Sequence, residues 1–167
     1  MNREVLYRGK SLVTKEWLTG RLVVAGADLS NTYCIVKNSD MEMDGHHIRQ
    51  ATDVPLYVDE KTIGEFSGCL DKNGTRIFEG DIVECCSWNE FFSDGSGKPL
   101  EPFLRKCVIE FRNGGFKMVE KRKFDYPGAE PAVWDIIFDG DIVVIGNIYD
   151  NPKLLEGRAD EKIELPK

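Results

Sequence analysis

Apolar residues occur along the chain in short runs that are rich in β-branched and aromatic side chains and are bounded by Gly, Asp, Asn or Pro. This pattern is typical of β-strands, because such side chains pack well on a pleated surface and the bounding residues favour turns. Helical periodicity is hard to find. The strands expected from the pattern are 5–8, 17–24, 32–37, 54–58, 63–66, 81–86, 132–138 and 142–149.

Two Asn-Gly dipeptides predict tight hairpins, since both residues tolerate the positive φ of a two-residue loop. A loop at Asn113-Gly114 gives the cross-strand pairs Phe111–Phe116, Ile109–Met118, Val108–Val119 and Glu110–Lys117. A loop at Asn73-Gly74 gives Asp71–Arg76, Leu70–Ile77 and Cys69–Phe78. Both registers set apolar residues opposite each other and acids opposite bases, which stabilises a ribbon. A longer loop shifts the register.

The order of these elements predicts a mostly β fold. A strand led by Gly-Asp, a long loop, a tight hairpin and a final apolar strand is the order of an SH3-like antiparallel barrel, which we assign to residues 61–156. Residues 1–60 are expected to form a smaller N-terminal β-rich lobe, and residues 157–167 a flexible charged tail. A short C-terminal helix is expected from the cap, first helical position and end signals of Asn151, Pro152 and Gly157.

A short motif is repeated. Residues 78–83 and 138–143 share the pattern Phe-acid-Gly-Asp-Ile-Val and are identical at five of six positions. A corner that ends one strand and starts the next explains both copies, because Gly takes positive φ at no steric cost. The alternative is a duplication in which the paired corners have a function, with Asp81 and Asp141 as an acid/base pair.

The charge of the chain is uneven. Lys and Arg number 22 and Asp and Glu 29, for a net charge of −7, which disfavours nonspecific binding to nucleic acid. Residues 105–123 are the exception, with seven bases and two acids. Their hairpin register sets Lys106 opposite Lys121, an unfavourable pair unless the strands splay or an anion lies there. The alternative to an anion-binding surface is a solvated ribbon whose aromatic face lies in the core.

This basic hairpin gives a nucleic-acid-binding hypothesis. Its bases would contact a phosphate backbone while aromatic side chains stack on nucleobases. The residues proposed for this role are Arg105, Lys106, Lys121, Arg122 and Lys123. The long loop 87–102 holds further aromatic residues, which either pack in the core or are offered to a partner.

The cysteines and the N-terminus indicate a compartment. Five cysteines are present, an odd number, and adjacent Cys85 and Cys86 point to opposite faces of a strand, so a disulfide framework is not expected. No apolar stretch follows a basic start as in a secretory signal, and no apolar run reaches the roughly 18 residues of a membrane helix. We expect a cytoplasmic protein with reduced thiols that does not enter a membrane.

The sequence contains only weak signals of a metal-binding or catalytic site. Residues 40–47 gather three acids with both histidines, His46 and His47, but lack the spacing of a calcium loop or a zinc site, so an exposed acidic loop is expected. A metal-dependent enzyme centred on this segment is the less favoured alternative. The sequence has no nucleophile-elbow, phosphate-loop or dinucleotide-binding motif. We therefore expect no catalytic residue, no metal and no cofactor.

Several motifs resemble a known family. They are Tyr7-Arg8-Gly9-Lys10, Trp17-Leu18-Thr19-Gly20, the block from Thr62 to Val83 and the close from Val144 to Pro152. Together they resemble the YopX family of phage and prophage proteins, over nearly the whole chain. Departures are Cys69, where the family tends to have an aliphatic residue, and the divergent segments 25–53 and 87–102.

The resemblance implies a mostly β protein with a C-terminal SH3-like barrel, encoded by a phage or an integrated element. It implies no activity and transfers no catalytic residue. We therefore expect an accessory protein of unknown biochemical function in the cytoplasm of a bacterial host. The favoured interpretation is a noncatalytic binding module that acts through an unknown protein partner or self-association; nucleic acid is the alternative ligand.

Overall fold

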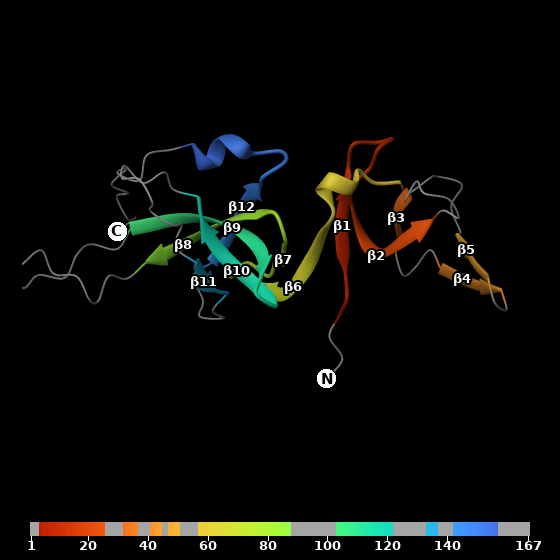
Figure 1. The fold of residues 1–167 in the computed structure, drawn as a ribbon, viewed down its shortest axis with the longest axis horizontal. Helices are drawn as coiled ribbons and strands as arrows, with labels where there is room; N and C mark the ends of the chain where they lie inside the picture. The colour runs from red at the N-terminus through yellow and green to blue at the C-terminus, as the bar shows by residue number, and fades with distance from the viewer. Residues whose placement is uncertain are drawn as a thin grey trace, which may run out of the picture. The chain divides into compact units, whose positions relative to one another are not determined.

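The structure is a computed structural model that describes residues 4–25, 32–36, 41–44, 47–50, 57–87, 103–121, 133–136 and 142–156. These residues form two antiparallel five-stranded sheets and one two-stranded hairpin, so the mostly β expectation is confirmed (Figure 1). Their helices are two 3-10 turns, η2 (Glu60–Thr62) and η3 (Pro152–Leu155). None of the described helices is long and apolar enough to span a bilayer. The chain divides into two compact units, Met1–Gly68 and Cys69–Lys167.

The first unit is built around strand β1. β1 (Tyr7–Lys10) pairs antiparallel with β2 (Trp17–Ala25) on one side and with the start of β6 (Gly64–Leu70) on the other, and β3 (Thr32–Val36) pairs with β2. A Cβ at Gly9 would lie 3.0 Å from Val58 Cβ, so glycine permits close packing there. A separate hairpin pairs β4 (Met41–Asp44) with β5 (His47–Gln50).

The boundary between the units differs from the expected one after residue 60. The chain divides after Gly68, within β6, whose first residues pair with β1. Gly64 pairs with Arg8 and Glu65 pairs with Tyr7, so the start of β6 is a strand of the first unit. The expected tail, 157–167, lies outside the described residues.

Between β6 and β7 (Arg76–Phe78), a three-residue loop joins Asp71 to Thr75, so the expected two-residue loop is wrong. The Asp71 N–H donates to the Thr75 carbonyl at 2.8 Å, so Asp71 lies opposite Thr75 rather than Arg76. Gly74 has φ +82° and completes the turn. The Asp71 side chain favours this longer loop, because it accepts hydrogen bonds from the N–H groups of Asn73 and Thr75, both at 2.8 Å.

The second sheet has the strand order β11-β10-β9-β8-β12. Its strands are β8 (Asp81–Ser87), β9 (Phe103–Arg112), β10 (Gly115–Glu120), β11 (Val133–Asp135) and β12 (Ile142–Asn147). Apolar residues of β6 and β7 and of the second sheet together form the core of this unit, which removes them from water. The buried members of that core are Cys69, Ile77, Val83, Cys107, Ile109, Met118 and Ile142.

The hairpin of β9 and β10 confirms its predicted register. Asn113 and Gly114 have φ of 50° and 80°, as a two-residue loop of this kind requires. All four expected pairs form: Phe111–Phe116, Ile109–Met118, Val108–Val119 and Glu110–Lys117. The Asn-Gly signal and the matching of side chains across the strands were therefore sufficient to fix this ribbon.

Two finer expectations are not confirmed. Among the described residues no pairing joins β11 to β12, so the closed SH3-like barrel expected from the sequence is not confirmed. The expected C-terminal helix is only the 3-10 turn Pro152–Leu155, and the Asn151 side chain does not cap it. Asn151 Oδ1 instead accepts a hydrogen bond from the Asn147 N–H at 3.3 Å, so it does not accept from an N–H of the 3-10 turn.

Candidate functional site

Arg105 lies on the inner side of the second sheet rather than on an open surface. It stands opposite Cys85, and its Nη1 lies 3.4 Å from Oε2 of Glu120 on β10. The guanidinium also stacks 4.7 Å from the centre of the Trp134 ring on β11. Its side chain is 19% exposed and that of Glu120 is 8% exposed, so this ion pair is shielded from water. Arg105 therefore links β9, β10 and β11.

Lys121 and Arg112 share one carboxylate, that of Glu110. Arg112 contacts Glu110 Oε2 at 2.7 Å, and Lys121 forms an ion pair with Glu110 Oε1. Burial raises the pKa of Glu110, but the hydrogen bonds and charges of Lys121 and Arg112 outweigh it and lower the pKa below its usual range. A further ion pair joins Lys117 of β10 to Asp135 of β11.

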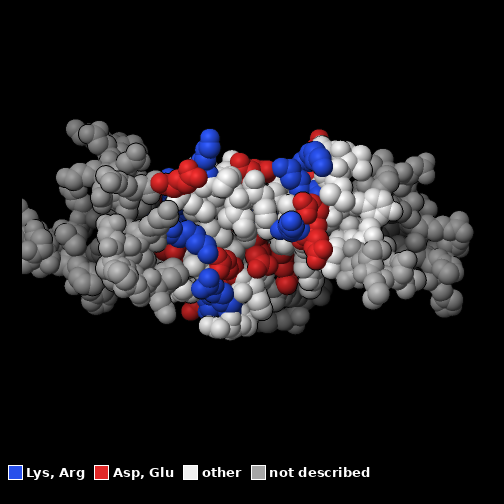
Figure 2. Space-filling view, turned by 45° about the horizontal axis from the view of Figure 1, so that its top comes forward, with Lys and Arg blue, Asp and Glu red and all other residues white. Residues whose placement is uncertain are grey.

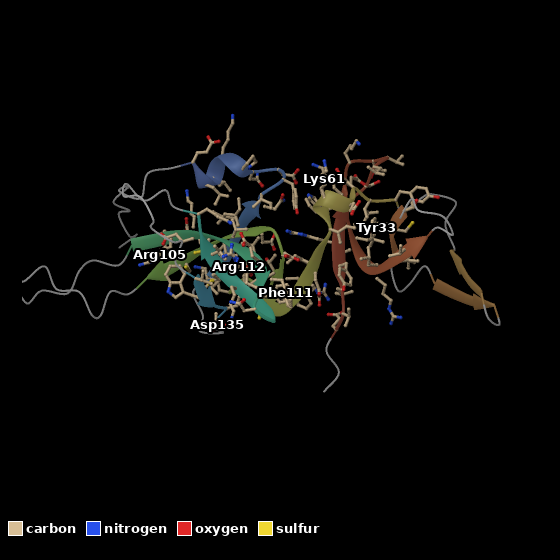
Figure 3. All side chains as sticks on the ribbon, in the orientation of Figure 1. Tyr33, Lys61, Arg105, Phe111, Arg112 and Asp135 are labelled. Carbon is tan, nitrogen blue, oxygen red and sulfur yellow. The ribbon has the colours of Figure 1, made fainter. Side chains whose placement is uncertain are left out.

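These contacts place an acidic side chain beside each of Arg105, Arg112, Lys117 and Lys121. On the face drawn in Figure 2, Lys and Arg side chains lie beside Asp and Glu side chains in the described part of the chain. Figure 3 shows Arg105, Arg112, Phe111 and Asp135 on the strands of this sheet. The described bases of the hairpin thus have acidic neighbours from the same sheet.

The expected Lys106–Lys121 pair does not form. The register of β9 and β10 ends at Cys107–Glu120, one pair before the two lysines would meet. Lys106 is exposed and stands opposite Glu84 of β8. Of the five proposed nucleic-acid-binding residues, Arg105 and Lys121 are in ion pairs, Lys106 faces an acid, and Arg122 and Lys123 lie outside the described residues.

Asp71, which the sequence placed only as the cross-strand partner of Arg76, is a buried structural residue. It is 7% exposed, and its Oδ2 accepts a hydrogen bond from the Val144 N–H at 3.1 Å, in addition to the bonds from the turn. Burial raises the pKa of Asp71, but the hydrogen bonds from Thr75, Val144 and Asn73 outweigh it and lower the pKa. An Asp two residues before Asn-Gly was the available signal, because Asp side chains bond the backbone of turns.

Asp81 has the turn role expected of the repeated corner. It is 1% exposed, and its Oδ2 accepts a hydrogen bond from the Phe78 N–H at 2.7 Å. Gly80 has φ +81°, as such a corner needs. Asp141 and the second corner lie outside the described residues, so a pairing of Asp81 with Asp141 stays a prediction.

The segment 40–47, which the sequence weighed as a metal site, is only partly described by the structure. The backbones of β4 and β5 pair Asp44 with His47, while Asp40, Gly45 and His46 lie outside the described residues. In the part of the chain that the structure describes, no group of three or more His, Cys, Asp or Glu side chains is placed to hold a metal ion.

These features define a β protein whose buried carboxylates stabilise strands and turns. A family model for YopX protein matches residues 6–156, so the chain belongs to the YopX family, as its motifs predicted. It is also similar to a crystal structure of protein EF1440 from Enterococcus faecalis, with 23% identity, a TM-score of 0.50, and coverage of 92% of this chain and 99% of that one. That likeness concerns the fold. No curated protein matched the chain.

Proposed function

We propose that the chain is a noncatalytic binding module, encoded by a phage or prophage, that acts in the bacterial cytoplasm through a protein partner or through self-association. We also propose that its second sheet belongs to an SH3-like barrel. The YopX motifs support the phage origin, since this is what the resemblance implies. The absence of strong catalytic motifs from the sequence supports a binding role.

The observation that carries this proposal is that the buried carboxylates bind groups of the fold itself. Among the described residues, Asp71, Asp81 and Glu120 are the buried carboxylates. Asp71 and Asp81 accept hydrogen bonds from backbone N–H groups, and Glu120 pairs with Arg105. A general acid or base must reach a substrate, so carboxylates held inside the fold in this way favour a structural role.

Phe111 supports binding to a partner. It is 53% exposed at the end of β9, and its ring centre lies 5.2 Å from that of Phe116 in an edge-to-face arrangement. Exposed aromatic residues held rigid by a neighbour lose little freedom on binding and are frequent anchors of interfaces.

We expect the Phe111→Ser variant to lose a bound protein that the tagged wild-type chain retains from phage-induced host lysate, or to lose concentration-dependent dimerisation in light scattering. Val13→Ser is the matched control, since Val13 is 61% exposed and lies in the first unit. Turnover of a hydrolase substrate by the purified chain would contradict the proposal. If both variants retained the partner protein equally, Phe111 would not be part of the binding surface.

We expect no binding of short DNA or RNA at micromolar protein and low salt in a fluorescence-anisotropy titration. The physical reason is that Glu120, Glu110 and Asp135 offset the bases of the hairpin. Binding that weakens linearly with the logarithm of salt concentration, and that is lost in the variant Lys121→Glu with Arg122→Glu, would establish the nucleic-acid alternative instead.

A further inference from the structure

The two Asn-Gly dipeptides of the chain both lie in exposed turns. Asn73 and Gly74 are exposed between β6 and β7, and Asn113 and Gly114 are exposed between β9 and β10. Asparagine followed by glycine readily loses its side-chain amide in water, because glycine has no Cβ to hinder attack by its own main-chain nitrogen. The fold therefore places the same reactive pair in two different surroundings.

The loss of the amide is a cyclisation followed by hydrolysis. The main-chain nitrogen of the glycine gives up its proton and attacks Cγ of the asparagine; the N–Cγ bond forms, the Cγ–Nδ2 bond breaks, and ammonia leaves with a proton from water. Water then opens the succinimide ring at either carbonyl. Opening at Cγ gives aspartate, and opening at the main-chain carbonyl gives isoaspartate, in which the chain runs through Cβ and Cγ.

Both turns must open before this ring can close. In β-turns of these kinds the main chain holds the glycine nitrogen away from Cγ of the asparagine, so the bond between Cα and the carbonyl carbon of the asparagine has to rotate. The rate at each dipeptide thus depends on how often its turn opens locally. Local opening is rarer where more hydrogen bonds have to break.

The turn that contains Asn73 is held closed by Asp71. The Gly74 nitrogen donates to the Asp71 carbonyl at 2.9 Å, and the N–H groups of Asn73 and Thr75 donate to Asp71 Oδ1, both at 2.8 Å. Asp71 Oδ2 also accepts from the Val144 N–H, which fixes the turn to β12. The attacking nitrogen is therefore occupied, and the nearby carboxylate disfavours the loss of its proton.

The turn that contains Asn113 has fewer restraints. The last strand pair before it is Arg112–Gly115, and in the described part of the chain no hydrogen bond holds Asn113 or Gly114. No atom lies within 4 Å of a Cβ added at Gly114 or Gly115. Two successive glycines with no packed neighbours let this tip rotate without disturbing the core.

We propose that Asn113 is a site of spontaneous deamidation in the folded chain, and that Asp71 protects Asn73 from the same reaction. The proposal rests on the hydrogen bonds of the two turns and does not depend on the proposed binding function. Deamidation adds a negative charge beside Arg112, and isoaspartate adds a main-chain carbon to a loop of only two residues. The reaction thus alters the end of the hairpin next to Phe111.

The test uses the full chain, kept folded at neutral pH and physiological temperature. Peptide mass spectrometry, with the aspartate and isoaspartate products separated by chromatography, follows both dipeptides over time. We expect Asn113 to be converted at least several-fold faster than Asn73. Equal conversion at the two positions, or faster conversion of Asn73, would overturn the proposal.

The same chain unfolded in guanidinium chloride is the control for local sequence. Without the turns, each dipeptide follows a basic residue, Lys72 or Arg112, so we expect the two rates to be similar. If the ratio of the rates in the folded chain equalled the ratio in the unfolded chain, the turns would not distinguish the two sites and the proposal would be wrong.

A variant isolates the role of Asp71. Asp71→Ala removes the carboxylate that accepts from Asn73 and Thr75, so we expect Asn73 to react several-fold faster than in the wild type, with the rate at Asn113 as the internal reference. Asp135→Ala is the matched control, since Asp135 is an exposed carboxylate paired with a side chain outside both turns. An unchanged rate at Asn73 in folded Asp71→Ala would overturn the protective role. If this variant does not fold, the comparison of folded with unfolded wild type decides.

Discussion

Asp71→Asn is expected to lower the free energy of unfolding by about 2–4 kcal/mol. The carboxylate accepts hydrogen bonds from Asn73, Thr75 and Val144, and so joins the β6–β7 turn to β12. An amide is of the same size, but its NH₂ group cannot accept, so at least one buried N–H loses its partner. The melting temperature should fall by roughly 5–15 °C, measured by circular dichroism on the full chain.

The same residue predicts a dependence on pH. The pKa of Asp71 in the folded chain is below its ordinary value of 3.8, so the unfolded state binds the proton more readily. The stabilisation by the carboxylate is therefore complete above about pH 4–5 and is lost as pH falls through the lower folded pKa. We expect the difference in stability between wild type and Asp71→Asn to shrink below pH 4.

Asp135→Asn is the control for this experiment. Asp135 is likewise a carboxylate of this unit, paired with the side chain of Lys117, but its own side chain is 76% exposed. Exposed ion pairs contribute little, so the loss should be below about 1 kcal/mol. Equal losses for Asp71→Asn and Asp135→Asn, or a difference between them that does not change with pH, would show that Asp71 is not a structural carboxylate.

The comparison of the two hairpins shows how far the sequence alone could reach. At Asn113-Gly114 the loop residues and the facing side chains favour the same register, and that register is found. At Asn73-Gly74 the same dipeptide is part of a longer turn, because the Asp71 side chain bonds the N–H groups of the loop. The backbone preference of Asn-Gly is the same in both hairpins, so the side-chain hydrogen bonds of Asp71 account for the longer loop at the second one.

The candidate site was less predictable than the fold. The sequence shows that Arg105 and Lys121 are basic, but their ion-pair partners depend on which strands meet. Glu120 lies on β10 and contacts Arg105 of the paired strand β9. Trp134 lies on β11, for which the sequence predicted no partner strand. The pairing of Lys106 with Glu84 likewise depends on the register of β8 with β9, which no hairpin motif in the sequence predicted.

The corner at Gly80 gives the second large effect, and Gly80→Ala is expected to lower the free energy of unfolding by about 2–4 kcal/mol. A φ of +81° costs an alanine about 1–2 kcal/mol. The added Cβ would also lie 3.1 Å from Cε2 of Tyr149. The backbone cannot easily move away, because the Gly80 N–H donates to the Ile109 carbonyl at 2.8 Å and the Gly80 carbonyl accepts from the Ile148 N–H at 2.9 Å.

Gly114→Ala separates the two contributions to this loss. Gly114 has nearly the same φ, +80°, but no atom lies within 4 Å of an added Cβ, so only the backbone strain of about 1–2 kcal/mol applies. Urea unfolding of both variants measures the difference, which is the packing of the corner against β12 and the residues that follow it. Equal losses at the two positions would mean that Tyr149 yields to the new methyl group, and that the corner motif is retained for its turn geometry alone.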